Sequence, residues 1–449
     1  MTSKLPASLP VSPADALVVN SPPLRVVIRS VTGLAERFGW WKQPLPRAAT
    51  ETGEMSALDN LYWIHKSRHP VCEYERAMDP AKRPDTDLMQ IALPEGMEIS
   101  AEVTIGAAGD MLRSPGIEAS RDVLFEKVSD LIFDQDIAFS NYESPVTTQP
   151  LVEEVIGDAG PPVECSGQDH FDIFKGHQGR NFDILHTANN HMYDMGAEGI
   201  ETTLVALREA GILPLGSQSD PVEYGRAVVY EQNGIRIGFV SDCFGLNGRT
   251  LAEEDRHRIH VSKLLSKRAA PDLTLLKRQI DDALAQGCDF VIASVHWGYE
   301  FEFFPREVQI DAARELVEYG ADSLICHHPH VIQPVEVYRT RRDPERLAVI
   351  AYSLGSLTWS FMAPHIVLST ILNLKLAKGK HGDREVTYVA SAKATPVFRS
   401  YVEEQGRKVT RIEKLSDHDQ SSPFDAGWIK AIRDYATLVL GPGGSGSRS

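Results

Sequence analysis

Apolar segments that end in polar residues alternate with amphipathic helical patterns through the middle of this chain. The strands are predicted at 97–110, 136–145, 182–188, 289–295 and 321–326, because each is a short apolar run that stops at turn or polar residues. The helices are predicted at 121–135, 199–211, 273–287 and 307–320, where apolar residues recur three and four positions apart. This alternation predicts an α/β domain over roughly residues 100–375 with a largely buried mixed sheet.

Further segments continue this pattern. Residues 225–242 predict a hairpin with an Asn233-Gly234 turn, and residues 347–356 predict another strand. Residues 30–43 predict a short helix, but the first hundred residues carry no chemistry that we would assign to a site. The expected divisions are an N-terminal extension that is partly disordered (1–98), the core domain (99–375), C-terminal strands and a helix packed on the core (376–440), and a disordered tail (441–449).

The charge balance limits the partners. The chain of 449 residues has a formal net charge of −16, which repels nucleic acid and anionic lipid surfaces. An anionic substrate would therefore need bound cations or a local basic patch. Arg339, Arg341 and Arg342 could supply such a patch, but a solvated loop is the favoured interpretation of these arginines.

The cysteines and the hydropathy pattern bear on location. There are five cysteines, an odd number, and they form no C-x-x-C pair, which is typical of reduced thiols. The first residues do not form a convincing signal peptide, and no stretch reaches the ~18 apolar residues of a membrane span. We therefore expect a cytoplasmic protein without a transmembrane segment.

Residues with metal-binding or acid-base chemistry follow five of the predicted strands. They are Asp110; Asn141 and Glu143; Asn190, His191 and Asp194; His296 and Glu300; His328 and His330. Each group alone is a weak signal, since an Asn-rich turn can cap a helix and clustered histidines can form a plain polar loop. Their joint placement is the informative feature, because loops at one edge of a sheet can point their side chains at one centre.

This set of side chains has mixed oxygen and nitrogen donors. Such a mixture suits one or two catalytic divalent cations (Mn, Zn, Fe or Mg) better than a structural zinc ion. His328 and His330 alternate in the chain, so they converge only if the loop bends, and Pro329 can supply that bend. A histidine beside the cations can act as a proton donor, and Glu300 can orient a histidine or a substrate group.

The motifs NYESPVT, ANNHMYDMGAEGI, HWGYEFE, HHPHVIQPVE and YSLGS, in this order, resemble the capsule-synthesis protein CapA (poly-γ-glutamate biosynthesis) family. That family is placed in the calcineurin-like metallophosphoesterase superfamily, and the resemblance covers roughly residues 100–360. It implies a four-layer α/β/β/α sandwich with metals at the strand ends. The metal positions that follow are Asp110, Asn141, Glu143, Asn190, His296, His328 and His330, and the catalytic positions are His191, Glu300 and Asp194.

The sequence departs from the superfamily pattern at three places. Leu112 stands where the first motif, Asp-x-His, has its histidine, which would leave one metal position a ligand short. Cys326 replaces the glycine that usually precedes the His-rich loop. Ser356 and Leu357 alter the final motif, usually YSLGNF, and so a wall of the expected pocket.

Three functions are compatible with these residues. The first, implied by the resemblance, is a metal-dependent hydrolase or transferase acting on γ-glutamyl amides or poly-γ-glutamate, so the partner would be an anionic or γ-glutamyl small molecule or polymer. The second is a metal-dependent phosphoesterase, because the same cations can serve a phosphoryl group. The third is a non-catalytic capsule assembly or binding protein, working with capsule-type biosynthetic partners.

Overall fold

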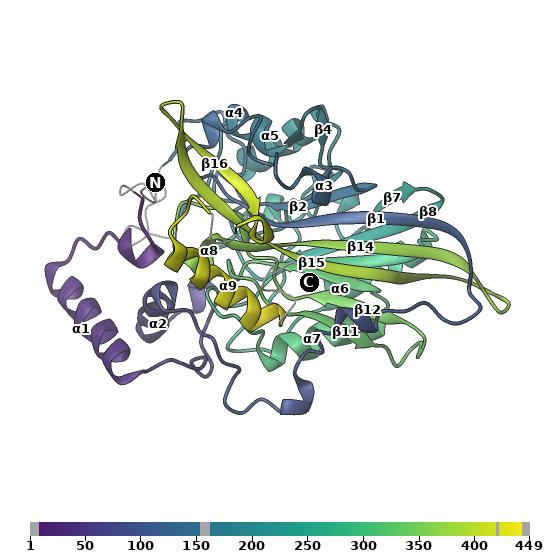
Figure 1. Ribbon diagram of the computed structural model, residues 1–449, viewed down its shortest axis with the longest axis horizontal. Helices are drawn as coiled ribbons and strands as arrows, with labels where there is room; N and C mark the ends of the chain where they lie inside the picture. The colour runs from purple at the N-terminus through teal and green to yellow at the C-terminus, as the bar shows by residue number, and fades with distance from the viewer. Residues whose placement is uncertain (1–8, 153–161, 419–421, 442–449) are drawn as a thin grey trace.

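The computed structural model describes residues 9–152, 162–418 and 422–441, and two β-sheets packed face to face form its centre (Figure 1). The predicted tail beyond residue 441 and the first eight residues lie outside the described part. The alternation of the sequence alone predicted one mixed sheet, but the strands divide between two.

Sheet one has eight strands in the order β16-β15-β14-β1-β2-β5-β6, and β13 also pairs with β1. Its strands are β1 (Glu98–Met111), β2 (Ile137–Tyr142), β5 (Ile184–His186), β6 (Leu213–Leu215), β13 (Ser356–Thr358), β14 (Leu368–His381), β15 (Arg384–Glu404) and β16 (Arg407–Lys414). The run β1-β2-β5-β6 is parallel, whereas β14, β15 and β16 are antiparallel.

Sheet two has six strands in the order β11-β12-β10-β9-β8-β7. Its strands are β7 (Val228–Gln232), β8 (Ile235–Cys243), β9 (Phe290–His296), β10 (Ser323–His327), β11 (Val335–Arg339) and β12 (Leu347–Ala351). The predicted hairpin joins β7 to β8, and both turn residues, Asn233 and Gly234, have the positive φ that a tight hairpin turn needs. A separate two-stranded ribbon consists of β3 (Gly176–His177) and β4 (Arg180–Asn181).

The described residues form nine α-helices, some of which cover the outer faces of the sheets. They are α1 (Pro22–Phe38), α2 (Ala57–Arg68), α3 (Ser129–Ile132), α4 (Gln168–Phe174), α5 (Gly196–Glu209), α6 (Thr274–Ala285), α7 (Glu307–Tyr319), α8 (Pro364–Val367) and α9 (Ala426–Leu440). Apolar residues of α3, α4 and α5 pack on sheet one, and those of α6 and α7 pack on sheet two. Alternate residues of the strands, such as Ile105, Phe139 and Ile292, face a core between the sheets. The four-layer α/β/β/α order is confirmed (Figure 1).

The strand register aligns the polar residues at the carboxyl ends. Asp110 lies opposite Asn141 across the β1–β2 pair, and Asn141 lies opposite His186 across β2–β5. In sheet two, His296 lies opposite His327 across β9–β10. Parallel neighbours in register therefore deliver these side chains to one edge of each sheet.

Two glycines permit a close approach at the end of β1. A Cβ atom on Gly109 would lie 2.0 Å from the carbonyl oxygen of Gly355, and Gly355 has φ of 76°. That carbonyl accepts a hydrogen bond from the amide of Asp110 at 2.9 Å. The G-D and S-L-G-S segments are thus held together through backbone contact, which places Ser356 beside Asp110.

The helix predicted at 121–135 is wrong over most of its length, since only Ser129–Ile132 is α-helical. The Leu124 carbonyl accepts the amide of Ile412 from β16 at 2.9 Å, and the amide of Val128 bonds to Phe125 instead. Leu124, Phe125 and Val128 are fully buried under sheet one. Tertiary packing therefore overrides local helix propensity here.

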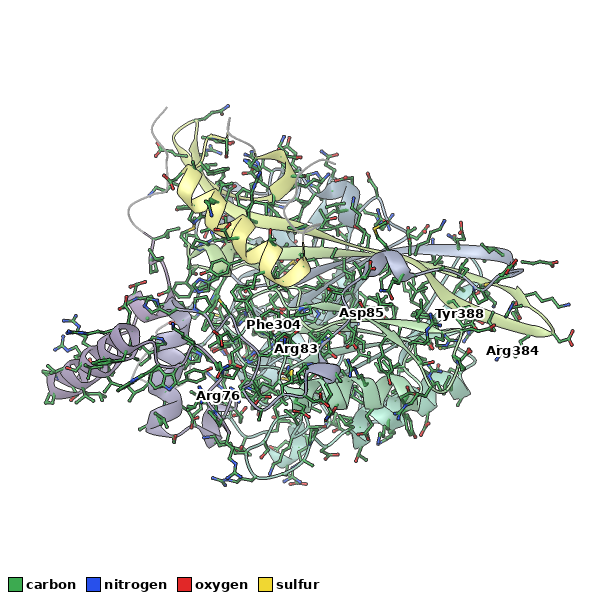
Figure 2. All side chains as sticks on the ribbon, turned by 60° about the horizontal axis from the view of Figure 1, so that its bottom comes forward. Arg76, Arg83, Asp85, Phe304, Arg384 and Tyr388 are labelled. Atoms are coloured by element: carbon green, nitrogen blue, oxygen red, sulfur yellow. The ribbon has the colours of Figure 1, made fainter. Side chains whose placement is uncertain are left out.

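The C-terminal strands complete sheet one. Within the region 376–440, where we predicted C-terminal strands and a helix, residues 384–404 form the single 21-residue strand β15. Its partner β14 was not predicted, and our division at residue 375 falls within it. Strand β1 accompanies β14 as far as Lys380, close to the turn of the β14–β15 hairpin, and Arg384 and Tyr388 lie on this part of the hairpin (Figure 2).

The N-terminal extension packs against the loops of the core domain. Helix α1 begins eight residues before the predicted segment and ends at Gly39, whose φ of 64° suits a helix terminus. After α2 the chain packs on the loop that follows β9, where Tyr74 stacks on Phe304 with ring centroids 4.2 Å apart. The Arg83 guanidinium carbon lies 4.8 Å from the centroid of the Tyr74 ring. Phe304 and Arg83 are labelled in Figure 2. None of the helices in the described residues is long and apolar enough to cross a membrane.

Candidate metal centre

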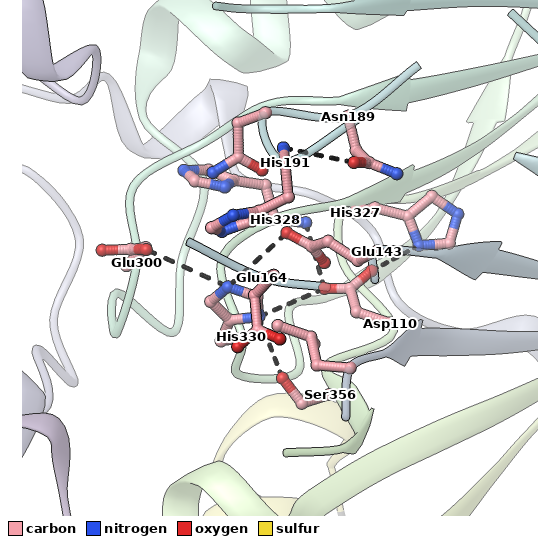
Figure 3. Close-up of polar contacts among 12 residues, drawn as sticks. Asp110, Glu143, Glu164, Asn189, His191, Glu300, His327, His328, His330 and Ser356 are labelled. Atoms are coloured by element: carbon pink, nitrogen blue, oxygen red, sulfur yellow. Dashed lines mark hydrogen bonds and ion pairs between the residues drawn. The ribbon is translucent and has the colours of Figure 1, made fainter. Parts of the chain in front are cut away.

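Asp110 contacts four residues at the strand ends. Its Oδ1 lies 2.9 Å from Asn141 Nδ2 and 3.0 Å from His327 Nδ1. Its Oδ2 accepts the backbone amide of His328 at 3.3 Å and lies 3.4 Å from His330 Nδ1 (Figure 3). Asp110 thereby joins the end of sheet one to the His-rich loop of sheet two.

Glu143 and His296 meet Asn190 in the same buried space. His296 Nε2 lies 2.8 Å from Asn190 Oδ1 and 3.3 Å from Glu143 Oε1. The Asn141 amide bridges to Glu143 Oε2 at 3.2 Å and to His296 Nδ1 at 3.3 Å. The predicted metal positions therefore converge, although they come from strand ends up to 220 positions apart in the chain.

The His-rich loop bends as its histidines require. His328 has φ of 98° and His330 has φ of 56°, values that non-glycine residues adopt rarely and that are concentrated at functional sites. Pro329 lies between them and packs where a Cβ on Gly298 would stand, 2.8 Å from the proline ring. His330 Nδ1 is 2.9 Å from the Ser356 hydroxyl, which fixes the ring on the side of sheet one.

A second group of residues surrounds His191. Its Nδ1 lies 2.7 Å from Asp194 Oδ2, and Asp194 Oδ1 is paired with Arg249 at 2.9 Å. Asn189 accepts the backbone amide of His191 at 3.2 Å (Figure 3). The arrangement fixes the imidazole through Nδ1 and leaves Nε2 as the nitrogen that can exchange a proton.

Donor atoms of two overlapping groups lie within 4.8 Å of one another. One group is Asp110, Glu143 and His296, and the other is Glu143, His328 and His330. Glu143 Oε1 and His328 Nδ1 are buried and have no hydrogen-bond partner among the described residues. A buried acceptor without a partner is costly, so these atoms fit the place of a cation, with Glu143 between two positions.

The pKa directions suit a site that binds a cation. Burial, and after it the charge of Asp110, raises the pKa of Glu143 well above its ordinary value. Burial would also raise the pKa of Asp110, but hydrogen bonds from His327 and His330 outweigh it and hold that pKa well below the ordinary value. Burial and neighbouring histidines lower the pKa of His296 and His328, which keeps both rings neutral and able to bind a cation.

The centre lies beside a cavity of about 630 Å³ and reaches its floor through His328 and His330. Asn190, His191, Glu300, His328 and His330 line it from the core domain. Glu300 Oε1 lies 3.9 Å from His330 Nε2, and burial raises the pKa of Glu300. The donor cluster is therefore reachable from one side, where the predicted catalytic residues His191 and Glu300 also lie.

Several residues at this site were not predicted. His327 Nδ1 lies 3.0 Å from Asp110 Oδ1, and the rings of His186 and His327 are tilted against each other with centroids 5.6 Å apart. Both stand on strands that we recognised, at inward-facing positions, so alternation along those strands could have identified them. Thr50 and Trp63 come from the extension: Thr50 Oγ1 lies 3.3 Å from His328 Nε2, and the Trp63 indole donates to Glu300. No local motif marks these two.

Three other residues that the sequence analysis singled out contribute no donor or positive charge to the cavity. Leu112 is buried and offers no donor at the position of the missing histidine. The Arg341 and Arg342 amides bond to Glu318, and the Arg342 guanidinium pairs with Asp322 at 2.6 Å. This arginine loop does not line the cavity and so supplies no basic patch to it.

Two packed sheets, outer helices and a buried set of carboxylates and imidazoles at the strand ends define an α/β sandwich protein with a candidate metal centre. The sequence model described as bacterial capsule synthesis protein PGA_cap matches residues 104–359. This is more than half of the chain, so the chain belongs to that family.

Curated relatives carry related descriptions. The chain is 28% identical over 265 residues to "Capsule biosynthesis protein CapA" of Bacillus anthracis, covering 57% of this chain and 59% of that protein. It is 26% identical over 280 residues to "PGA biosynthesis protein CapA" of Bacillus subtilis (strain 168), covering 61% and 67%. A "probable polyglutamine synthesis accessory protein" of Mycobacterium tuberculosis is 26% identical over 156 residues, covering 34% and 40%. The match thus spans about three fifths of the Bacillus anthracis relative.

Two solved structures are distant. A calcineurin-like phosphoesterase YfkN from Bacillus subtilis is 12% identical, with a TM-score of 0.35, over 76% of this chain and 98% of that one. A hypothetical protein from Thermus thermophilus is 13% identical, with a TM-score of 0.34, over 65% and 99%. Scores at this level carry no argument about fold or function.

Proposed function

We propose that this protein is a divalent-metal-dependent hydrolase or transferase that acts on a γ-glutamyl amide bond in capsule or poly-γ-glutamate metabolism. The observation that carries the proposal is the convergence of buried carboxylates and imidazoles beside a cavity that His191 also lines. The donors are Asp110, Glu143, His296, His328 and His330, and of these His328 and His330 line the cavity. The descriptions of the Bacillus relatives, which name capsule and PGA biosynthesis, support the substrate class.

A divalent cation held by these donors would supply the positive charge that polarises a carbonyl or phosphoryl group and acidifies water. Asp110, with Asn141 and His327 behind it, holds its carboxylate toward that position. Asn190 Oδ1 and His296 Nε2, which lie 2.8 Å apart, would add an oxygen and a nitrogen donor to the same set. The fixed orientation of these donors is what the strand ends contribute to the reaction.

His191 serves as the proton donor in this scheme. Asp194 holds Nδ1 of the ring, so Nε2 faces the cavity side of the loop and can protonate a departing amine. In hydrolysis the carbon–nitrogen bond breaks, the oxygen of water bonds to the carbonyl carbon, and a proton passes through His191 to the amine. In transfer an acceptor amine replaces water, and its proton takes the same route.

Two other functions, a phosphoesterase and a non-catalytic assembly protein, are compatible with the same residues. The same donors could serve a phosphoester, because mixed carboxylate and imidazole sites suit phosphoryl transfer equally well. The relative described as an accessory protein favours a non-catalytic role in capsule assembly instead.

The decisive experiment is a substrate panel with the purified full chain and added Mn²⁺. Turnover of γ-glutamyl amides but not phosphoesters supports the proposal, whereas turnover of phosphoesters alone replaces it with the second function. His191→Ala should abolish turnover while metal content stays unchanged, because His191 belongs to neither donor group. No turnover of any substrate by a fully metal-loaded protein would favour the accessory role.

For location, we propose the cytoplasm. All five cysteines are free thiols, and none of the described helices is of the membrane-spanning kind. Free, partly buried thiols are typical of a reducing compartment.

A further inference from the structure

We propose that the N-terminal extension forms an apolar subsite next to the candidate metal centre, and that the substrate carries an alkyl chain beside the reacting bond. The occupant is an amphiphilic amide whose polar head reaches His191 and the donor cluster and whose chain lies along α1 and α2. The identity of the reacting bond rests on the proposed function; the subsite itself does not.

The cavity has two chemically different ends. The core domain supplies polar side chains to its floor, as described above. The extension supplies the opposite wall, where the lining residues include Leu24, Val27 and Ile28 of α1 and Met55, Leu61 and Trp63 at α2. A molecule that fills the whole space must therefore be polar at one end and apolar at the other.

Buried polar contacts fix the position of this wall. Glu302, on the loop after β9, accepts hydrogen bonds from Tyr62 at 2.9 Å and Lys66 at 3.0 Å, and is paired with Arg306 at 2.9 Å. All four side chains are almost fully buried. Trp63 reaches Glu300 from the same helix. A network satisfied in this way holds α2 in one place relative to the floor.

The wall itself remains largely in contact with water. Of the 17 residues of α1, only Ala35 is buried, and Leu24 and Val27 are 42% and 50% exposed although they line the cavity. Apolar surface inside a cavity that also contains a reactive centre favours a ligand able to cover it.

The charges disfavour a long polyanion at this wall. Among the described lining residues Lys66 is the one Lys or Arg, and it already pairs with Glu302. Asp59 and Glu300 line the same space and carry or can carry negative charge. A run of free carboxylates would meet no compensating cation there, whereas an alkyl chain needs none.

This subsite consists of residues outside the range that matches the family, which is 104–359. The floor of the cavity therefore follows the family, and the apolar wall is a property of the extension. The inference narrows the substrate from any γ-glutamyl amide to one with an apolar group on its amine side or acyl side.

The test measures binding and turnover separately on the full chain with Mn²⁺. Calorimetry with γ-glutamyl methylamide, butylamide and octylamide should show affinity rising by roughly threefold for each added methylene. Val27→Asp should lower affinity for the octylamide at least tenfold. Val26→Asp is the matched control: it makes the same change one residue away on α1, at a 64% exposed position that does not line the cavity, and should bind like the wild type.

The outcomes separate the two proposals. Turnover of all three amides at equal efficiency overturns the subsite and leaves the proposed function standing. Chain-length-dependent binding without turnover of any amide supports the subsite and overturns the proposed function. Equal losses in Val26→Asp and Val27→Asp would also overturn the subsite. Should Val27→Asp fail to fold, as judged by circular dichroism, Val27→Thr keeps the side-chain shape and should reduce octylamide affinity about threefold.

Discussion

The floor of the cavity and its opposite wall are formed by different kinds of structure. The floor is built by strand ends of two sheets, where register aligns Asp110 with Asn141 and His296 with His327. The opposite wall comes from helices that precede the sheets in sequence and dock through side chains such as Trp63 and Lys66. The potential metal ligands therefore lie on strand ends, where the backbone is most constrained. The opposite wall of the cavity comes from helices whose residues could change without altering the strands.

The largest expected effect separates the floor from the rest of the molecule. His296→Ala and Asp110→Asn each remove a donor of the first group, so bound metal should fall to background and turnover should drop roughly a hundredfold or more. Elemental analysis and steady-state kinetics measure the two effects. His381→Ala, at the far end of β14, is the control and should change neither. Normal metal content in both variants would mean that the floor is not a metal centre.

The next effect tests whether the wall is firmly docked. Glu302→Gln would leave Lys66 and Arg306 buried without a countercharge and should lower the free energy of unfolding by about 3–5 kcal/mol. Urea titration measures this loss, and limited proteolysis should show faster cleavage between residues 69 and 97. Asp434→Asn, which removes the exposed pair with Lys430, should have little effect. Similar stability of the two variants would contradict a docked extension.

The response to pH should differ between two buried carboxylates. Burial would raise the pKa of Glu302, but Arg306 and Lys66 outweigh it and lower the pKa. Asp242 in β8 forms no ion pair with a Lys or Arg of the described residues, and burial raises its pKa to about 8. Its unfolded value is about 3.9, so the folded state holds the proton more tightly, and this stabilisation is complete below about pH 4 and is lost as pH rises toward 8.

The free energy of unfolding should therefore fall between pH 5 and 8, by at most about 1.4 kcal/mol per pH unit from Asp242. Asp242→Asn keeps a neutral group of the same shape, so its stability should depend less on pH over this range. Urea midpoints at four pH values measure the slope. An unchanged slope in the variant would show that Asp242 is ionised in the folded protein.

The smallest expected effect concerns the contact between the two walls. Trp63→Phe removes the indole donor to Glu300 and keeps most of the apolar surface. We expect kcat to fall about threefold to tenfold with KM nearly unchanged, because Glu300 loses orientation rather than contact with substrate. Leu58→Phe, on an exposed part of the same helix, is the control. A change confined to KM would assign Trp63 to substrate binding alone.

The sequence was sufficient for the floor because each of its groups follows a recognisable strand. Apolar runs predicted β1, β2, β5, β9 and β10, and their polar ends named the residues that converge. His327 was not predicted as a site residue, because the neighbouring pair His328 and His330 forms the stronger metal-ligand pattern. The roles that we assigned to these residues remain predictions.

The wall could not be predicted for a physical reason. Its residues have no common motif, and they acquire a function only through contacts such as Thr50 with His328, 278 positions away in the chain. A distant contact also explains the wrong helix prediction at 121–135, because the carbonyl of Leu124 accepts a hydrogen bond from the amide of Ile412 in β16. Local patterns contain no information about partners that distant.

The pairing of β1 has a consequence for synthesis of the chain on the ribosome. Its polar end, at Asp110, is fixed by Gly355 and Ser356, and its outer edge is covered only by β14. At translation rates of about 5–20 residues per second, roughly 12–50 s pass between the emergence of these segments. During that interval the apolar strand β1 has an unpaired edge. The nascent chain should therefore depend on chaperones until its last third has been synthesised.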